Sequence, residues 1–177
     1  MIDETGYGQN IDIVLNNAQY LIDNDPEHNL MFSLHAYWQP KYFNNPLQLM
    51  KQKLEVVVDK NIPLIIGEFT GCYTDDPNSN DQMYTVLLPE CERLELGWIA
   101  WEWGPGNADY SVDPPLLYPL MDLTSDGTFA SIKDNWSKAI LVSDPNSIQK
   151  TSVTPQYIID GGVCVTSTSV AEHLPGS

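Results

Sequence analysis

The chain has 177 residues, which corresponds to one domain or to one domain with a short extension. Eight lysines and arginines stand against 24 aspartates and glutamates, so the formal net charge of −16 argues against nucleic acid and anionic membrane surfaces as partners. Hydrophobic residues make up 42%, which argues against disorder throughout, and no apolar run reaches the roughly 20 residues that span a bilayer.

The three cysteines, Cys72, Cys91 and Cys164, are too few for a disulfide framework. They leave open either a single bridge with one free thiol or three free thiols. The N-terminal stretch MIDETGYGQN lacks the basic segment and the apolar core of a signal peptide. We therefore expect either a protein that stays inside the cell or a chain that is a piece of a longer protein.

Helical and strand patterns alternate through the first 142 residues. The expected helices have apolar residues at spacings of three and four, whereas the expected strands are short apolar and aromatic runs. The expected helices are residues 10–24, 46–60, 80–95 and 128–142, and the expected strands are residues 30–38, 62–69 and 96–103. This alternation predicts an α/β fold with a parallel sheet and crossover helices.

The spacing of the expected strands is regular. They begin near Met31, Leu64 and Gly97, which are 33 residues apart each time. A (β/α)8 barrel uses about 31 residues per unit, and doubly wound sheets have similar spacing. Residues 143–177 are polar and rich in turn residues, so we expect one unit over residues 1–142, followed by a linker-like tail or the start of a further module.

Side chains that can do chemistry gather where the expected strands end. They are His35 and Tyr37 on the first strand, Glu68 on the second, and Trp101 and Trp103 on the third. Parallel barrels carry their function at the carboxyl ends of the strands. Aromatic faces stack on sugar rings, and a carboxylate among them suits glycoside hydrolysis, whose transition state resembles an oxocarbenium ion. The pattern therefore predicts a carbohydrate site.

Each of these residues also has a structural interpretation. Glu68 after a strand is also typical of a loop or helix-capping carboxylate, His35 of a hydrogen-bonded core histidine, and the tryptophans of a buried core. Strand alternation puts Trp101 and Trp103 on one face and Glu102 on the other. Alternation thus favours a helix-side or rim position for Glu102 over the role of a second catalytic acid.

Taken together, MFSLHAYW, IPLIIGEF and LGWIAWEWGPGN resemble the sixth, seventh and eighth strands of glycoside hydrolase family 5, a cellulase-like family of (β/α)8 retaining enzymes. The resemblance covers residues 2–153. It points to the bacterial β-mannanase-like branch, because DETGYGQN and ASIKDNWSKAILVSDPNSIQKTSV also resemble that branch. It implies that the chain is the C-terminal part of a TIM barrel, about strands six to eight with their helices.

The resemblance also implies roles for single residues. Glu68 matches the nucleophile, Tyr37 and His35 match the His-x-Tyr pair beside it, and Trp101 matches the floor of the sugar site. Trp103, Trp38 and Tyr7 are further candidates for substrate contacts. The family implies a polysaccharide or oligosaccharide substrate, no cofactor, no metal and an extracellular location.

The sequence departs from the family in two respects. No Asn-Glu dipeptide, which would carry the acid/base, occurs in the chain. The family also has an arginine near the nucleophile, and the single arginine of this chain, Arg93, does not match it because it lies on an expected helix. The main hypothesis is a retaining endo-β-1,4-glycanase of mannanase or cellulase type, present as a fragment without its acid/base. The alternatives are a non-catalytic carbohydrate-binding half-barrel, a half-barrel completed by a second chain, and a small doubly wound α/β domain without a hydrolase role.

Overall fold

The computed structural model describes residues 1–3, 5–38, 44–71, 83–106, 108–109, 111–117, 119, 121–159 and 161. Cys72, Cys164 and the tail from residue 162 lie outside these ranges, so the disulfide alternatives stay open. Cys91 is a free and buried cysteine. Burial, with a smaller contribution from the charge of Glu90, raises the pKa of the Cys91 thiol to about 12, so this thiol stays protonated at neutral pH.

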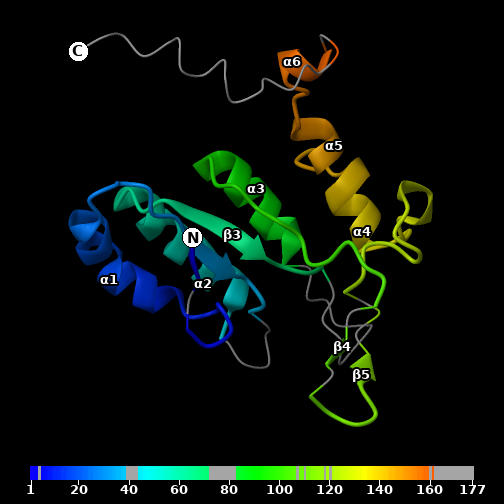
Figure 1. Ribbon diagram of the computed structural model, residues 1–177, viewed down its shortest axis with the longest axis horizontal. Coiled ribbons are helices and arrows are strands. Elements are labelled where there is room, and N and C mark those ends of the chain that lie inside the picture. The colour runs from blue at the N-terminus through cyan, green and yellow to red at the C-terminus, as the bar shows by residue number, and fades with distance from the viewer. Residues whose placement is uncertain are drawn as a thin grey trace, which may run out of the picture.

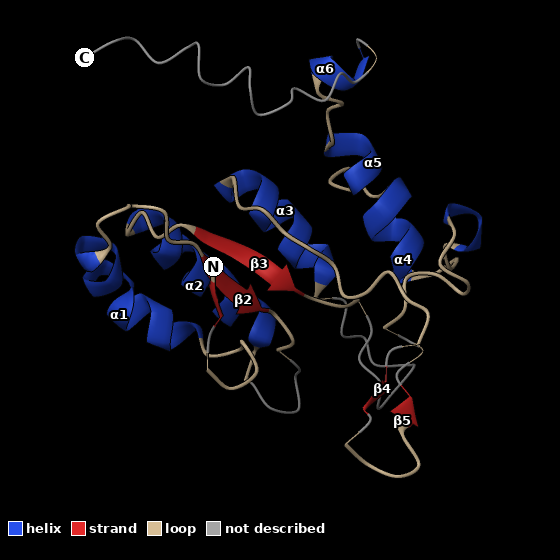
Figure 2. Ribbon diagram, in the orientation of Figure 1, coloured by secondary structure: helices blue, strands red, loops and turns tan. Residues whose placement is uncertain are grey.

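The centre of the molecule is a parallel sheet of three strands in the order β1–β2–β3 (Figures 1 and 2). These strands are β1 (Ile2–Asp3), β2 (Phe32–His35) and β3 (Leu64–Glu68). The α/β arrangement with a parallel sheet is therefore confirmed. β2 and β3 are shorter than the runs that predicted them, and β1 was not expected, because two residues are too few to show a strand period.

The expected strand over residues 96–103 is only partly formed. A single parallel bridge joins Trp98 to Ile66 of β3. The N–H of Ile66 donates to the Gly97 carbonyl (2.9 Å), and the N–H of Ile99 donates to the Ile66 carbonyl (2.8 Å). The segment thus lies beside β3 as the next member of the sheet, but it leaves the regular ladder after Trp98.

Three amphipathic helices pack on this sheet (Figure 1). They are α1 (Ile11–Asn24), α2 (Pro46–Asp59) and α3 (Tyr84–Leu94). Their apolar stripes enter one core cluster with the strands, and that cluster includes Val14, Ala18, Met50, Leu54, Val57 and Leu87. All three correspond to expected helices, and α3 accommodates Pro89 within its length.

The prediction of a single helix over residues 128–142 is wrong. The structure has a 3-10 turn η1 (Phe129–Ser131), then α4 (Trp136–Lys138) and a π-helical stretch η2 (Ala139–Ser143). A new helix begins at Trp136 because the Asn135 side chain accepts a hydrogen bond from the Ser137 N–H (2.9 Å).

Two short helices, α5 (Ile148–Thr151) and α6 (Gln156–Ile159), follow and lead away from the sheet in Figure 1. The expected boundary between residues 142 and 143 falls inside η2 and stays a prediction. The loop before η1 contains a small antiparallel pair, β4 (Ala108–Asp109) and β5 (Leu116–Leu117). Among the residues that the structure describes, no helix combines the length and apolar character needed to cross a membrane.

Candidate active site

His35, Tyr37 and Glu68 meet at the carboxyl ends of β2 and β3. The Tyr37 hydroxyl donates a hydrogen bond to Glu68 Oε2 (3.0 Å), and His35 Nδ1 lies 3.4 Å from the same oxygen. The side chains of His35 and Glu68 are 18% and 25% exposed, so both stay accessible to a ligand. Within the described part of the chain, the second oxygen, Glu68 Oε1, has no polar partner.

An irregular strand register brings His35 opposite Glu68. Leu34 pairs with Ile66, but the next pair is His35 with Glu68, so Gly67 is the extra residue of a bulge in β3. A Cβ atom at Gly67 would lie 2.1 Å from Ser33 Oγ, so only glycine fits there without a shift of its neighbours. The Gly-Glu pair in the sequence therefore has a structural reason as well as a chemical one.

Asp3 is a member of this group that sequence reasoning missed. Its Oδ1 lies 3.6 Å from His35 Nε2, on the opposite side of the ring from Glu68. Asp3 ends β1, the strand that was not expected. The signal in the sequence was weak, because a two-residue strand before a glycine-rich turn shows no period.

The turn that follows β1 supports the His35 ring. The His35 N–H donates to the Gly8 carbonyl (2.7 Å), and the Trp38 indole N–H donates to the Gln9 carbonyl (3.1 Å). Gly8 has a φ of +77°, and a Cβ atom there would lie 2.4 Å from His35 Cγ. The ring therefore packs directly against the backbone of Gly8, and both the space and the backbone angle require glycine.

The structure places the other two aromatic candidates of this region differently. Tyr7 is 92% exposed at the turn after β1, so its ring is available to a ligand. Trp38 is 2% exposed and is fixed through its indole N–H, so its burial does not favour direct contact with a sugar. Both assignments stay predictions.

Trp101 lies beside the end of β3. Its backbone N–H donates to the Phe69 carbonyl (2.8 Å), one residue after Glu68. Its side chain is 36% exposed. A partly exposed indole near a strand end is compatible with a stacking platform, and this role stays a prediction for Trp101.

Trp103 belongs to a different pocket. Its indole N–H donates to the Gly127 carbonyl (2.8 Å), and its ring meets Phe129 edge-on with centroids 5.0 Å apart. The pocket has a volume of about 350 Å³ and is also lined by Ile132, Leu141, Val142, Ile148 and Gln149. None of His35, Tyr37 and Glu68 lines it, so the structure does not bring Trp103 together with them through this pocket.

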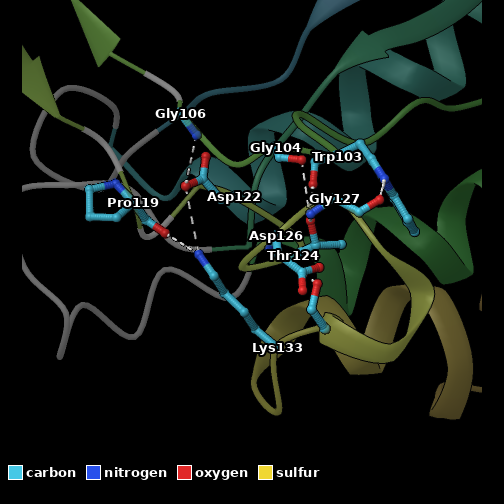
Figure 3. A network of polar contacts seen from close by, with 10 residues as sticks. Trp103, Gly104, Gly106, Pro119, Asp122, Thr124, Asp126, Gly127 and Lys133 are labelled. Carbon is cyan, nitrogen blue, oxygen red and sulfur yellow. Dashed lines mark hydrogen bonds and ion pairs between the residues drawn. The ribbon is translucent and has the colours of Figure 1, made fainter.

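A polar network fixes the chain around Trp103 (Figure 3). The Thr124 hydroxyl donates to the Trp103 carbonyl (2.7 Å) and accepts from the Gly127 N–H (3.0 Å). The buried Asp122 carboxylate lies 3.8 Å from the Lys133 ammonium group. The network joins residues that are far apart in the sequence. It lies beside two backbone hydrogen bonds, in which the Glu102 N–H donates to the Met121 carbonyl (3.2 Å) and the Leu123 N–H donates to the Glu102 carbonyl (2.9 Å).

Glu102 lies between the two groups of residues. Partial burial, followed by the negative charges of Asp122 and Glu68, raises the pKa of Glu102. The alternation argument, which directed Glu102 away from the site, does not hold here, because the segment leaves the ladder after Trp98. Glu102 therefore keeps its proton to a higher pH than an exposed glutamate does.

The chemistry available at the strand ends is that of a positioned carboxylate. Glu68 receives an O–H donor and faces an imidazole, both at one oxygen, which suits a nucleophile better than a metal ligand. Across the described ranges, no group of three or more His, Cys, Asp or Glu side chains is arranged to hold a metal ion.

Comparison with known proteins gives a consistent result. The family model "Cellulase (glycosyl hydrolase family 5)" matches residues 1–107. The chain is 28% identical over 152 residues to the mannan endo-1,4-beta-mannosidase of Salipaludibacillus agaradhaerens, a match that covers 86% of this chain and 44% of that protein. It is 31% identical over 112 residues to the beta-mannanase/endoglucanase A of Caldicellulosiruptor saccharolyticus, covering 62% of this chain and 8% of that protein.

Solved structures agree. The beta-mannanase from Streptomyces thermolilacinus with mannohexaose is similar at a TM-score of 0.68 and 26% identity, over 93% of this chain and 48% of that one. The mannotriose complex of the Thermomonospora fusca beta-mannanase is similar at a TM-score of 0.66 and 28% identity, over 90% and 46%. The chain thus spans less than half the length of these mannosidases and structures. The family match extends over more than half of the chain, and the chain belongs to glycosyl hydrolase family 5, the cellulase family.

Proposed function

We propose that the chain carries the nucleophile side of a retaining endo-β-1,4-glycanase site, with β-mannan as the first substrate class and β-glucan as the second. The observation that carries this proposal is the convergence of Tyr37 and His35 on one oxygen of Glu68. The relatives named as mannan endo-1,4-beta-mannosidases, and the related structures with mannotriose and mannohexaose, support mannan as the substrate.

Glu68 is the proposed nucleophile. Its Oε1 atom attacks the anomeric carbon while the bond from that carbon to the leaving oxygen breaks, which gives a glycosyl ester. Tyr37 and His35 hold Oε2, so that the carboxylate cannot rotate away from the sugar. Trp101 is the proposed platform under the sugar ring in the reacting subsite.

A second carboxylate is needed to protonate the leaving oxygen and later to activate water. In a retaining enzyme it lies about 5–5.5 Å from the nucleophile. Because the chain contains no Asn-Glu dipeptide, we propose that this acid/base comes from polypeptide other than these 177 residues, either in a longer chain or in a second chain that completes the barrel.

A carbohydrate-binding role without hydrolysis is the second candidate. It is favoured by the same absence of an Asn-Glu dipeptide, because the aromatic and hydroxyl contacts to a sugar do not require the acid/base.

We also propose that the protein acts outside the cell, since polymeric mannan is degraded there, and that residues 143–177 are a linker-like tail. Fractionation of a culture that expresses the protein checks the location.

A labelling experiment separates these functions. 2-Deoxy-2-fluoro-β-mannobiosyl fluoride forms the ester without an acid, because the C–F bond breaks as the Glu68 oxygen bonds to the anomeric carbon and fluoride leaves unprotonated. We expect the intact mass to increase by one 2-deoxy-2-fluoromannobiosyl group, and the labelled peptide to contain Glu68. The cellobiosyl analogue tests β-glucan.

Two variants serve as controls for the labelling experiment. Glu68→Gln is expected to lose the label completely, whereas Glu27→Gln, which changes an exposed turn glutamate, is expected to keep it. Absence of label in the unaltered protein, with tryptophan fluorescence that still responds to mannohexaose, would support the binding role. Absence of both would overturn the proposal.

A further inference from the structure

We propose that Asp3 is a positioning residue, which holds the orientation of the His35 ring beside Glu68 and draws the ring proton toward Nε2. The role of Glu68 as a nucleophile rests on the proposed function, but the contact itself does not. Asp3 Oδ1 lies 3.6 Å from His35 Nε2, and His35 Nδ1 lies 3.4 Å from Glu68 Oε2. One imidazole thus spans two carboxylates, and the three side chains come from three adjacent strands.

The surroundings leave the ring little freedom to move. The backbone of Gly8 lies against one face, since a Cβ atom there would be 2.4 Å from His35 Cγ and 2.5 Å from His35 Nδ1. Tyr37 meets the ring edge-on, with centroids 6.5 Å apart and an interplanar angle of 84°. The ring therefore cannot swing out as a whole without moving the turn after β1.

One motion remains, which is a half-turn of the ring about its Cβ–Cγ bond. It would place carbon atoms where Nδ1 and Nε2 now lie, and the ring C–H groups donate no ordinary hydrogen bonds. Glu68 opposes the half-turn from one side. Asp3 opposes it from the other side, because the carboxylate offers an acceptor only to a nitrogen.

Asp3 also bears on the location of the ring proton. A neutral imidazole has a single N–H, so it donates to Asp3 or to Glu68, whereas the protonated ring donates to both. Asp3 and Glu68 therefore compete for the proton of a neutral ring, and Asp3 draws that proton toward Nε2. Without Asp3, Glu68 is the acceptor that remains beside the ring among the described residues, so the proton of a neutral ring moves toward Nδ1.

The side chain of Asp3 is 59% exposed, so its replacement is compatible with folding. Asp3→Ala removes the acceptor and the charge, whereas Asp3→Asn removes the charge and keeps an acceptor oxygen. Asp12 is the matched control, because its side chain is also 59% exposed and also forms an ion pair, with Lys53 on another element. Asp12→Ala removes the same group without touching His35.

The test is a long-range ¹H–¹⁵N spectrum of the histidine rings in the full 177-residue chain, with His35 assigned from a His35→Gln variant. In the unaltered protein we expect the Nε2 atom of His35 to resonate between the positions of a protonated and an unprotonated nitrogen. In Asp3→Ala this signal is expected to shift toward the position of an unprotonated nitrogen, with Asp3→Asn between the two. Asp12→Ala is expected to leave it unchanged.

An identical His35 ring spectrum in Asp3→Ala would overturn the inference, whatever the protein does to sugars. A second readout uses the fluoride label of the proposed function. There Asp3→Ala is expected to slow labelling roughly tenfold through loss of the His35 orientation beside Glu68, with the response to mannohexaose retained. If the unaltered protein takes no label, the proposed function fails while the ring spectrum still decides the role of Asp3.

Discussion

Two regions of this molecule present side chains at the same end of the sheet, and they are held by different means. The region around His35 and Glu68 is placed by strand pairing, with a bulge at Gly67 and a glycine at position 8 against the ring. The region around Trp103 has two backbone hydrogen bonds beside it, from Glu102 to Met121 and from Leu123 to Glu102, and the Thr124 hydroxyl makes the central side-chain contacts.

The difference shows which kind of substitution each region is sensitive to. A strand ladder distributes its hydrogen bonds over many backbone groups, so the first region depends on backbone shape and on the absence of side chains at particular glycines. A polar network concentrates its contacts on a few side chains, so the second region depends on individual hydroxyl and carboxylate groups. Substitutions of different kinds should therefore affect the two regions.

The largest effect is expected for Gly8→Ala. A methyl group there meets the His35 ring, and the φ of +77° adds backbone strain, so we expect a loss of about 3 kcal/mol in the free energy of unfolding. Gly6→Ala is the control, because Gly6 has a φ of +63° with open space around it, and it should cost only about 1 kcal/mol. Urea unfolding measures both. Equal losses would contradict the packing of the ring on Gly8.

The next effect is expected for Thr124→Val. The hydroxyl is buried, and its loss leaves the Trp103 carbonyl and the Gly127 N–H without this partner, at a cost of about 2 kcal/mol. Thr124→Ser keeps the hydroxyl and should cost less than half as much. The emission of Trp103, isolated by comparison with Trp103→Phe, should shift in the valine variant only. A serine variant as unstable as the valine variant would show that the methyl group matters more.

Glu102 links the two regions and gives a smaller effect that depends on pH. Its pKa is raised in the folded protein, so its contribution to stability is present below the unfolded value of about 4.3 and is lost as the pH rises through the raised value. The free energy of unfolding of Glu102→Gln should therefore fall less steeply with pH over that range than that of the unaltered protein. Above that range it should be higher than that of the unaltered protein by up to about 1 kcal/mol. Urea unfolding from pH 4 to pH 8 is the measurement. The exposed control Glu92→Gln should follow the unaltered protein.

The smallest effect is expected just beyond the network, for Lys138→Ala. Lys138 forms an exposed pair with Asp134, four residues earlier in the chain, at 2.9 Å. Such pairs contribute about 0.3–0.5 kcal/mol and are screened by salt. Urea unfolding at low and high salt should show a loss of this size that disappears at high salt. A loss above 1 kcal/mol would mean that the network extends further than Thr124 and Asp122.

The sequence predicted the parts of the fold that show a period. Helices α1 to α3 and strands β2 and β3 are long enough for apolar residues to recur at fixed spacing. β1 has two residues and shows no period, so it was missed. The helix expected over residues 128–142 has a helical pattern, but Asn135 caps a new helix inside it. The competing local hydrogen bond decided the outcome there.

The residues of the candidate site also divide into those that the sequence predicted and those that it did not. His35, Tyr37 and Glu68 were found because each lies at the end of a recognisable strand, and the structure brings them together. Asp3 was missed together with its strand. The place of Trp103 was not predictable, because it is fixed by residues more than 20 positions later in the chain.

The bulge at Gly67 has a consequence for how such sites are gained and lost. Its single extra residue is the reason that an imidazole and a carboxylate face each other across two neighbouring strands. If the ladder continued without this bulge, His35, Tyr37 and Glu68 would all stay in the chain, but Gly67 would pair with His35, and Glu68 would lie opposite Ala36 on the other face of the sheet. A relative could therefore lose its chemistry through a change in strand register alone, although its sequence would still contain all of the site residues.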